Sequence, residues 1–350
     1  MFDWTNLDRW PEYHEALSLR WRRPDLPGHA GWCILDDPDT TDPHQAMQCT
    51  RHAQVLESLF SIQLRAKIER LLEDNEGTGP DRRTLVVEGP SGAGKTTTGM
   101  YEVLDMWHMA LAGPRPKGVD AKFHPFGYVA LGRLWKEPAI VRAMADFLKV
   151  TYAASDNTQT IIGYLNCWAP HIGLRAFIID DANFLKPDDS GRTADGLKNL
   201  LTSLNFTLIW LGKAPMSESA LFKVKESASA LAISAVEQIE LRARRFSTEE
   251  VFVDTTQRRA EWGKAMFTMS SQLHLLRGDP TVWLRDENLS DKMYARADGR
   301  LGSAYEALRE AALDAVEDPS VRFAAALGDA INRLPVIRKP KTGSRPWRSQ

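Results

Sequence analysis

Residues 84–100 read TLVVEGPSGAGKTTTGM, and no other segment says more about the architecture. Inside it lies the G-x-x-x-x-G-K-[ST] pattern of a phosphate-binding loop, from Gly89 to Thr96. An apolar strand run at 85–87 precedes the pattern, and apolar residues at helical spacing follow it, so both flanks have the form that such a loop requires. The stretch therefore predicts a strand, a phosphate loop and a helix in succession.

The chemistry of the loop follows from its residue types. Its glycines let the backbone N–H groups turn inward and form a concave site for phosphate oxygens. Lys95 supplies a mobile positive charge, and the hydroxyl of Thr96, where the next helix starts, can bind Mg²⁺. We therefore expect ATP and Mg²⁺ as cofactors, with ATP held by the run Gly89, Pro90, Ser91, Gly92, Ala93, Gly94, Lys95, Thr96 and Thr97.

Another apolar strand run, at 176–180, ends in the paired carboxylates Asp180 and Asp181. We expect Asp180 to bind Mg²⁺ through water, and Asp181 to act in catalysis by orienting the attacking water or taking its proton. The alternative is two solvated acids at a strand end. Most hydrolases of this kind carry Glu where Asp181 stands, and the shorter side chain predicts slow hydrolysis. Asn183 is a candidate contact for the γ-phosphate, and Lys213 stands where a γ-phosphate sensor would sit.

Three arginines, Arg242, Arg244 and Arg245, lie in the string SAVEQIELRARRF at the exit of the predicted α/β domain. A guanidinium at this place can reach the nucleotide of a neighbouring subunit and neutralise charge in the transition state. We therefore count the three as candidate catalytic residues acting in trans. For each of them the alternative is a solvated basic turn or a structural ion pair.

With 350 residues the chain is longer than one hydrophobic core usually supports, so we expect more than one unit. Apolar strand runs alternate with helical stretches up to about residue 255, which is typical of an α/β fold with a parallel sheet covered by helices. Helical segments dominate afterwards. The predicted divisions are an irregular extension at 1–45, an α/β ATP-binding domain at 46–255, a small all-helical lid domain at 256–335 and a disordered basic tail at 336–350.

Composition restricts the setting more than the function. The net charge of −2 is too small to argue for or against any partner, so nucleic-acid contacts would need a local basic patch. Cys33, Cys49 and Cys167 lack metal-like spacing, and we expect them to be reduced thiols. No apolar run approaches the ~20 residues of a membrane span, and the first residues lack the features of a signal peptide. These features predict a cytoplasmic protein without a membrane partner.

The order of a phosphate loop, a strand ending in two aspartates, an arginine-rich exit and a helical lid resembles that of an AAA+ ATPase. Several strings more particularly resemble the TniB and TnsC family of transposition ATPases, over roughly residues 46–330. These strings are RHAQVLESL at 51–59, GYVALGRLWKEPAIVRAMADFL at 127–148, ADGLKNLLTSLNFTLIWLGKAP at 194–215 and ARADGRLGSAYEALREAALDAVED at 295–318.

The resemblance implies the same ATP, Mg²⁺ and trans-arginine roles for the residues named above. It adds Arg300, which matches the approximate place of a second nucleotide sensor in the lid. Members of the family self-associate into a ring or helical filament on double-stranded DNA and deliver or activate a DDE transposase at a target site. If this carries over, the DNA contacts should be mostly to phosphates and strongly dependent on salt.

Three other functions fit parts of the pattern. IIDDANFL also resembles the strand end of replication initiators and helicase loaders, although no clear helix-turn-helix follows the lid. A small-molecule kinase with a P-loop would have an identical phosphate loop, but its lid is normally inserted within the sheet domain. A nucleotide switch would bind ATP without hydrolysing it. The first expectation remains an oligomeric, DNA-dependent ATPase that serves transposition.

Overall fold

The computed structural model describes most of the chain and divides it into two compact units. The described residues are 6–10, 41–52, 59–77, 81–114, 118–119, 123–132, 135–185, 192–213, 216–223, 229–248 and 255–335. One unit comprises Met1–Arg22 and Val55–Glu261, and the other comprises Arg23–Gln54 and Trp262–Gln350. The predicted basic tail at 336–350 lies outside the described residues, as does most of the predicted extension at 1–45.

The first unit is built on a parallel sheet, which confirms the predicted α/β class. In the described residues the sheet has the strand order β2-β3-β4-β1-β5, and every pairing is parallel. Because all strands run the same way, their carboxyl ends meet at one edge, where ligands bind in open α/β sheets. The strands are β1 (Thr84–Gly89), β2 (Phe126–Ala130), β3 (Ala176–Asp180), β4 (Thr207–Lys213) and β5 (Ala243–Ser247).

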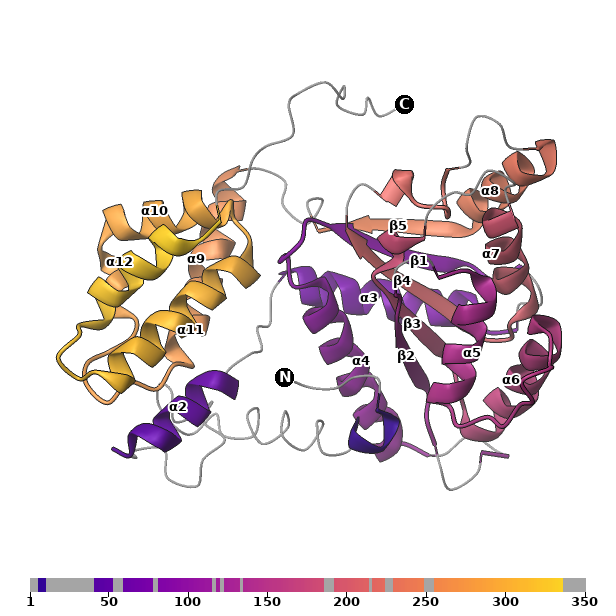
Figure 1. Cartoon of the computed structure of the whole chain (residues 1–350), viewed down its shortest axis with the longest axis horizontal. Coiled ribbons are helices and arrows are strands. Elements are labelled where there is room, and N and C mark those ends of the chain that lie inside the picture. The colour runs from indigo at the N-terminus through magenta and orange to yellow at the C-terminus, as the bar shows by residue number, and fades with distance from the viewer. Residues whose placement is uncertain are drawn as a thin grey trace. The chain divides into compact units, whose positions relative to one another are not determined.

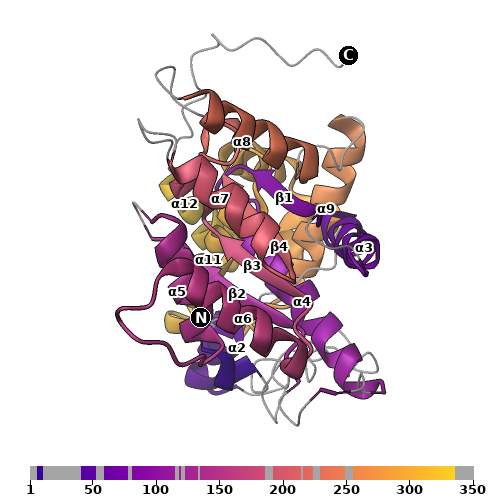
Figure 2. The same ribbon diagram turned by 90° about the vertical axis from the view of Figure 1, so that its right-hand side faces the viewer.

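Helices cover both faces of this sheet, as its apolar strands require. Figures 1 and 2 show α3 and α4 on one face and α5, α6, α7 and α8 on the other. Short 3₁₀ turns also occur, at Ala182–Phe184 (η3) and Met216–Glu218 (η4) in this unit. The helices are α3 (Leu59–Asp74), α4 (Lys95–Ala112), α5 (Glu137–Phe147), α6 (Thr158–Ile172), α7 (Arg192–Ser203) and α8 (Ala230–Arg242).

Strand β5 is an element that the sequence pattern did not reveal. Its residues read ARRFS, and only Phe246 among them is fully buried. The arginine side chains are partly exposed because β5 is an edge strand, so the apolar run that marks an internal strand is missing. Its pairing with β1 is therefore a tertiary feature.

One residue of the predicted irregular extension belongs to the core. Trp10 follows a short 3₁₀ helix, η1 (Leu7–Arg9), and its side chain is fully buried. Its ring meets Trp107 of α4 and Phe147 of α5 edge to face, with centroids 6.4 and 5.7 Å away. The expectation that residues 1–45 lie outside the core is therefore corrected at this position, where a single aromatic anchor leaves no periodic signal.

The second unit is helical, as predicted, but it includes a segment from the N-terminal part of the chain. Its helices are α2 (Pro43–His52), most of α9 (Thr255–Ser271), α10 (Glu287–Ala297), α11 (Leu301–Glu317) and α12 (Phe323–Arg333), with the 3₁₀ turn η5 (Val282–Arg285). The hydroxyl of Thr50 in α2 donates to the carbonyl of His274 (3.2 Å), whose N–H donates back to Thr50 Oγ1 (3.2 Å). Helix α2 thus groups with this unit, whereas the sequence pattern placed residues from 46 onward in the α/β domain.

No helix in the described part of the chain is long and apolar enough to cross a membrane. Cys167 is a free, exposed thiol on α6. Cys33 and the side chain of Cys49 lie outside the described residues.

Close packing at a glycine of β2 predicts a cost for adding one methyl group. A Cβ at Gly127 of β2 would lie 2.2 Å from the Phe177 ring of β3, which is fully buried. We expect Gly127→Ala to lower the free energy of unfolding by about 1–3 kcal/mol, measured by urea denaturation. Gly163→Ala on α6 is the matched control, because a Cβ there meets no atom within 4 Å. An equal effect of both substitutions would contradict the packing argument.

Candidate nucleotide-binding site

The phosphate loop lies between β1 and α4, at the sheet edge where the strands end. Gly92 and Gly94 have φ angles of 75° and 82°, a left-handed conformation that glycine adopts without steric cost. Gly94 is the N-cap residue of α4, so the first N–H groups of a helix 18 residues long are directed at the loop. Together with the helix dipole, these groups make a site for an anion.

Lys95 is held at the centre of the loop. Its side chain is buried, and Nζ donates hydrogen bonds to the carbonyls of Gly89 and Pro90, each at 2.9 Å. The ammonium therefore lies over the same turn whose glycines shape the backbone. A phosphate in the loop would meet a positive charge that is already positioned and partly removed from water.

The loop and the end of β3 are joined by one short hydrogen bond. Thr96 Oγ1 donates to Asp180 Oδ2 at 2.6 Å, although β4 lies between β1 and β3 in the sheet. The structure thus brings Thr96 and Asp180 together in one site, as the sequence predicted. A hydroxyl and a carboxylate are the hard oxygen ligands that Mg²⁺ prefers, so the donor set fits this ion.

Asp181 occupies a strained place directly after the strand. Its φ of 56° is left-handed, and its N–H donates to Asp180 Oδ1 at 2.8 Å. Burial raises the pKa of Asp181, the adjacent Asp180 raises it further, and Lys95 opposes both effects. The more basic carboxylate is a better proton acceptor, which suits the predicted role in activating water. That role stays a prediction.

Tyr128 is a member of the site that sequence reasoning missed. Tyr128 is the central residue of β2, and its side chain is buried. Its hydroxyl donates to Asp180 Oδ2 at 3.0 Å. Burial, with the charge of Asp180 and the hydrogen bond to it, raises the pKa of Tyr128 far above its usual range, so the phenol remains a donor. A tyrosine within a run of strand residues gives no sequence signal for this contact, because the contact depends on the pairing of β2 with β3.

The candidate sensor residues meet at the end of β4. Lys213 pairs with Gly89 in the sheet register, and its N–H donates to Asn183 Oδ1 at 3.0 Å. The amide of Asn183 therefore links the turn after β3 to the strand beside the phosphate loop. The Lys213 side chain is exposed. Contact of either residue with a γ-phosphate stays a prediction.

The three candidate trans arginines lie around the start of β5, toward the amino ends of the strands and away from the phosphate loop. Ala243 at the start of β5 pairs with Thr84, roughly 16 Å along β1 from the phosphate loop. A contact with the nucleotide of a second copy is the role predicted for them, and it stays a prediction. Within this chain each forms an ion pair: Arg242 with Asp81 (3.2 Å), Arg244 with Asp74 (2.6 Å) and Arg245 with Glu240 (3.2 Å).

Arg300, the candidate second sensor, is the N-cap residue of α11 in the helical unit. Its guanidinium lies 3.6 Å from the carboxylate of Asp298. The predicted contact with nucleotide depends on the placement of the helical unit against the α/β unit, and it stays a prediction.

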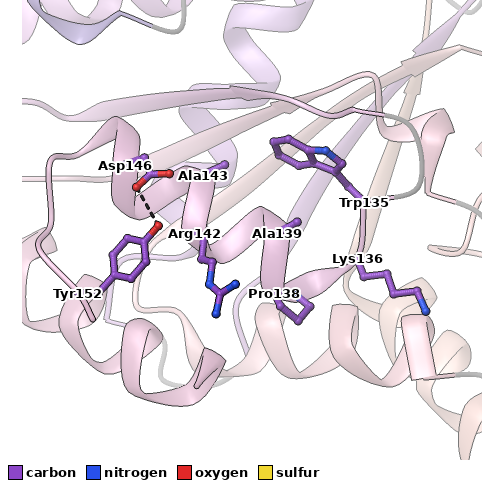
Figure 3. A pocket seen from close by; sticks show the side chains of 8 residues that line it. All are labelled: Trp135, Lys136, Pro138, Ala139, Arg142, Ala143, Asp146 and Tyr152. Atoms are coloured by element: carbon purple, nitrogen blue, oxygen red, sulfur yellow. Dashed lines mark hydrogen bonds between the residues drawn. The ribbon is translucent and has the colours of Figure 1, made fainter. Parts of the chain in front are cut away.

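A concave surface lies along α5, as Figure 3 shows. The aromatic rings of Trp135 and Tyr152 line it, and the Tyr152 hydroxyl donates to Asp146 Oδ1 at 2.9 Å. Lys136, the N-cap residue of α5, and Arg142 contribute exposed positive charge. No ion pair joins either cation to an acid within the described part of the chain. The sequence pattern did not single out this combination of aromatic rings and cations.

Comparison with known proteins finds the likeness in structure rather than in sequence. No family model matches the chain, and no curated protein matches it. The Aeropyrum pernix ORC2 protein in its ADP form superposes with a TM-score of 0.54 at 13% identity, covering 82% of this chain and 72% of that one. Its ADPNP–ADP complexes give 0.52 at 14% identity, over 78% and 68%.

Cdc6p from Pyrobaculum aerophilum gives a TM-score of 0.50 at 15% identity, over 77% of this chain and 66% of that one. This chain has the AAA+ fold. At such low identity the likeness shows the fold alone, and the chain spans about two thirds of the length of these proteins. The predicted AAA+ architecture is thereby confirmed. The finer resemblance to TniB and TnsC has no counterpart among these structures.

The position of Lys95 in the AAA+ loop predicts its effect on nucleotide affinity. We expect Lys95→Ala to weaken ATP binding about 10- to 100-fold, because a charge-assisted hydrogen bond to phosphate is lost. Binding of a fluorescent ATP analogue at equilibrium measures this change. Lys264→Ala on α9 removes an exposed lysine of the helical unit and should leave affinity unchanged. Equal affinities of the two variants would contradict the assignment of the loop.

Proposed function

We propose that the protein is an AAA+ ATPase that binds ATP with Mg²⁺, hydrolyses it slowly and assembles in several copies on double-stranded DNA. The observation that carries the proposal is the hydrogen bond between Thr96 and Asp180, because it joins the phosphate-loop segment to the carboxylate that we propose as a magnesium ligand. The archaeal proteins of similar fold include forms bound to ADP and ADPNP, which supports an adenine nucleotide as the ligand.

The residues of the site have separate roles in the proposed reaction. The loop N–H groups and Lys95 bind the phosphates, and Thr96 with Asp180 would hold Mg²⁺. When bound, the ion would neutralise negative charge on the nucleotide phosphates. Asp181 orients the attacking water and takes its proton, and its raised pKa favours this transfer. Because Asp is one methylene shorter than the usual Glu, we propose a low turnover number.

The cationic and aromatic surface of α5 supports the proposal of DNA binding. Helix α5 follows β2 in the chain, so Lys136 at its start comes after the carboxyl end of a strand, as the phosphate loop does. Lys136 and Arg142 offer positive charge to a phosphate backbone, and Trp135 offers an apolar ring beside them. Contacts of this kind bind DNA with little sequence preference and with strong salt dependence.

Two biological processes fit this ATPase, and different observations favour them. The solved structures of similar fold are ORC2 and Cdc6p, which favours a replication initiator or helicase loader. The strings that resemble TniB and TnsC favour a regulator of a DDE transposase. The structural comparison supports the first process better. Direct binding of this protein to a transposase or to a replicative helicase distinguishes them.

A small-molecule kinase has less support. The helical unit is built from chain segments that come before and after residues 55–261, whereas a kinase lid is an insertion within the sheet domain.

A single experiment tests the proposed function against the kinase alternative. We expect phosphate release to rise, and sedimentation to show large assemblies, when ATP and duplex DNA are both present. A protein that stays monomeric and consumes ATP only with a second small substrate would overturn the proposal.

The role of Asp181 predicts a separation of binding from hydrolysis. We expect Asp181→Asn to lower the rate of phosphate release about 100-fold or more while ATP binding and assembly persist. Asn tolerates the left-handed backbone at this position, so the fold should be retained. Asp329→Asn, on the exposed face of α12, is the control. Wild-type turnover by Asp181→Asn would remove Asp181 from the mechanism.

The α5 surface predicts a change in the salt dependence of DNA binding. For Lys136→Ala with Arg142→Ala, we expect the slope of log affinity against log salt concentration to become less steep by about 2, because two phosphate contacts are lost. Fluorescence anisotropy with duplex DNA measures this slope. Arg175→Ala is the control, since Arg175 pairs with Glu76 at the other end of the strands. An unchanged slope in the double variant would place the DNA contacts elsewhere.

A further inference from the structure

The carboxylate of Asp180 is oriented by three donors from three parts of the fold. Oδ2 accepts from Thr96 Oγ1 at 2.6 Å and from the Tyr128 hydroxyl at 3.0 Å, while Oδ1 accepts from the Asp181 N–H at 2.8 Å. Thr96 belongs to the phosphate-loop pattern, and Asp181 directly follows Asp180 in the chain. Tyr128 comes from β2, which has no part in the phosphate-loop pattern.

The sheet places Tyr128 at a fixed distance from Asp180. In the pairing of β2 with β3, Tyr128 lies opposite Ile178 and Ala130 lies opposite Asp180, so the two side chains are diagonal neighbours. A long aromatic side chain reaches its diagonal neighbour across adjacent strands. The Tyr128 ring is buried in the core cluster, and its hydroxyl is therefore held by rigid packing.

We propose that Tyr128 is a positioning residue for magnesium binding, which holds the Asp180 carboxylate in the orientation that the ion requires. The inference rests on the proposed ATPase function. Outer hydrogen bonds that orient a ligating carboxylate are worth about 10- to 100-fold in metal affinity. The Tyr128 hydroxyl donates to Asp180 Oδ2, so its proposed effect on the ion is exerted through that carboxylate.

Tyr128→Phe removes only the hydroxyl and keeps the ring. We expect the Mg²⁺ concentration that half-saturates binding of a fluorescent ATP analogue to rise about 10-fold. Affinity for the analogue in EDTA, where Asp180 has no ion to bind, should stay within about twofold of wild type, because the phosphate loop is unchanged. A general loss of structure would weaken both measurements together, so the split between them identifies a positioning role.

The matched control is Tyr164→Phe, which removes a tyrosine hydroxyl from the exposed surface of α6, outside every site proposed above. It should leave both measurements unchanged. A second comparison uses the Asp180→Asn background: if Tyr128 acts through Asp180, then Tyr128→Phe has no further effect there. This comparison remains informative if the substitution also lowers stability, since a stability effect would persist in that background.

The outcomes separate the inference from the function on which it rests. If wild type binds the analogue with a clear Mg²⁺ dependence and Tyr128→Phe gives the same curve, the positioning role is overturned and the ATPase proposal stands. If wild type shows no Mg²⁺-dependent binding, the proposed function fails and the role of Tyr128 fails with it. A tenfold shift that disappears in the Asp180→Asn background supports the inference.

Discussion

The hydrogen bond from Thr96 to Asp180 is the contact on which the candidate site depends. Thr96 lies in the first turn of α4, which follows β1, and Asp180 is the last residue of β3; β4 separates β1 from β3 in the sheet. Only the parallel arrangement brings both to the same edge, because carboxyl ends of parallel strands lie together. The bond therefore links the folding of the sheet to the formation of a place for phosphate and a hard cation.

Around this contact the site combines unfavourable backbone conformations with charged groups that are held in fixed positions. The turn glycines and Asp181 adopt left-handed conformations, and an aspartate accepts that conformation at a cost which the surrounding packing must offset. Lys95 is buried against its own loop carbonyls, and Asp180 accepts three hydrogen bonds. Each group is thus held before a ligand arrives, which lowers the entropy lost on binding.

The arginines at the end of α8 and in β5 form ion pairs within this chain, and a further role in contact with a second copy is still a proposal. Each has an acidic partner in its own chain, and Arg245 also lies over the Phe222 ring at 3.8 Å. The arginine side chains in these pairs are partly exposed, and ion pairs near the surface contribute little to stability, so their exchange for a partner in another subunit would cost little. The ion pairs are therefore compatible with the proposed assembly without being an argument for it.

Local pattern in the sequence determined the phosphate loop and the internal strands, because glycine spacing and apolar runs act over a few residues. It also predicted the α/β class. Only the tertiary structure decided the place of β5, the burial of Trp10, the grouping of α2 with the helical unit and the contact of Tyr128 with Asp180. These features depend on pairings between residues far apart in the chain, and such pairings leave no periodic trace in the sequence of either partner.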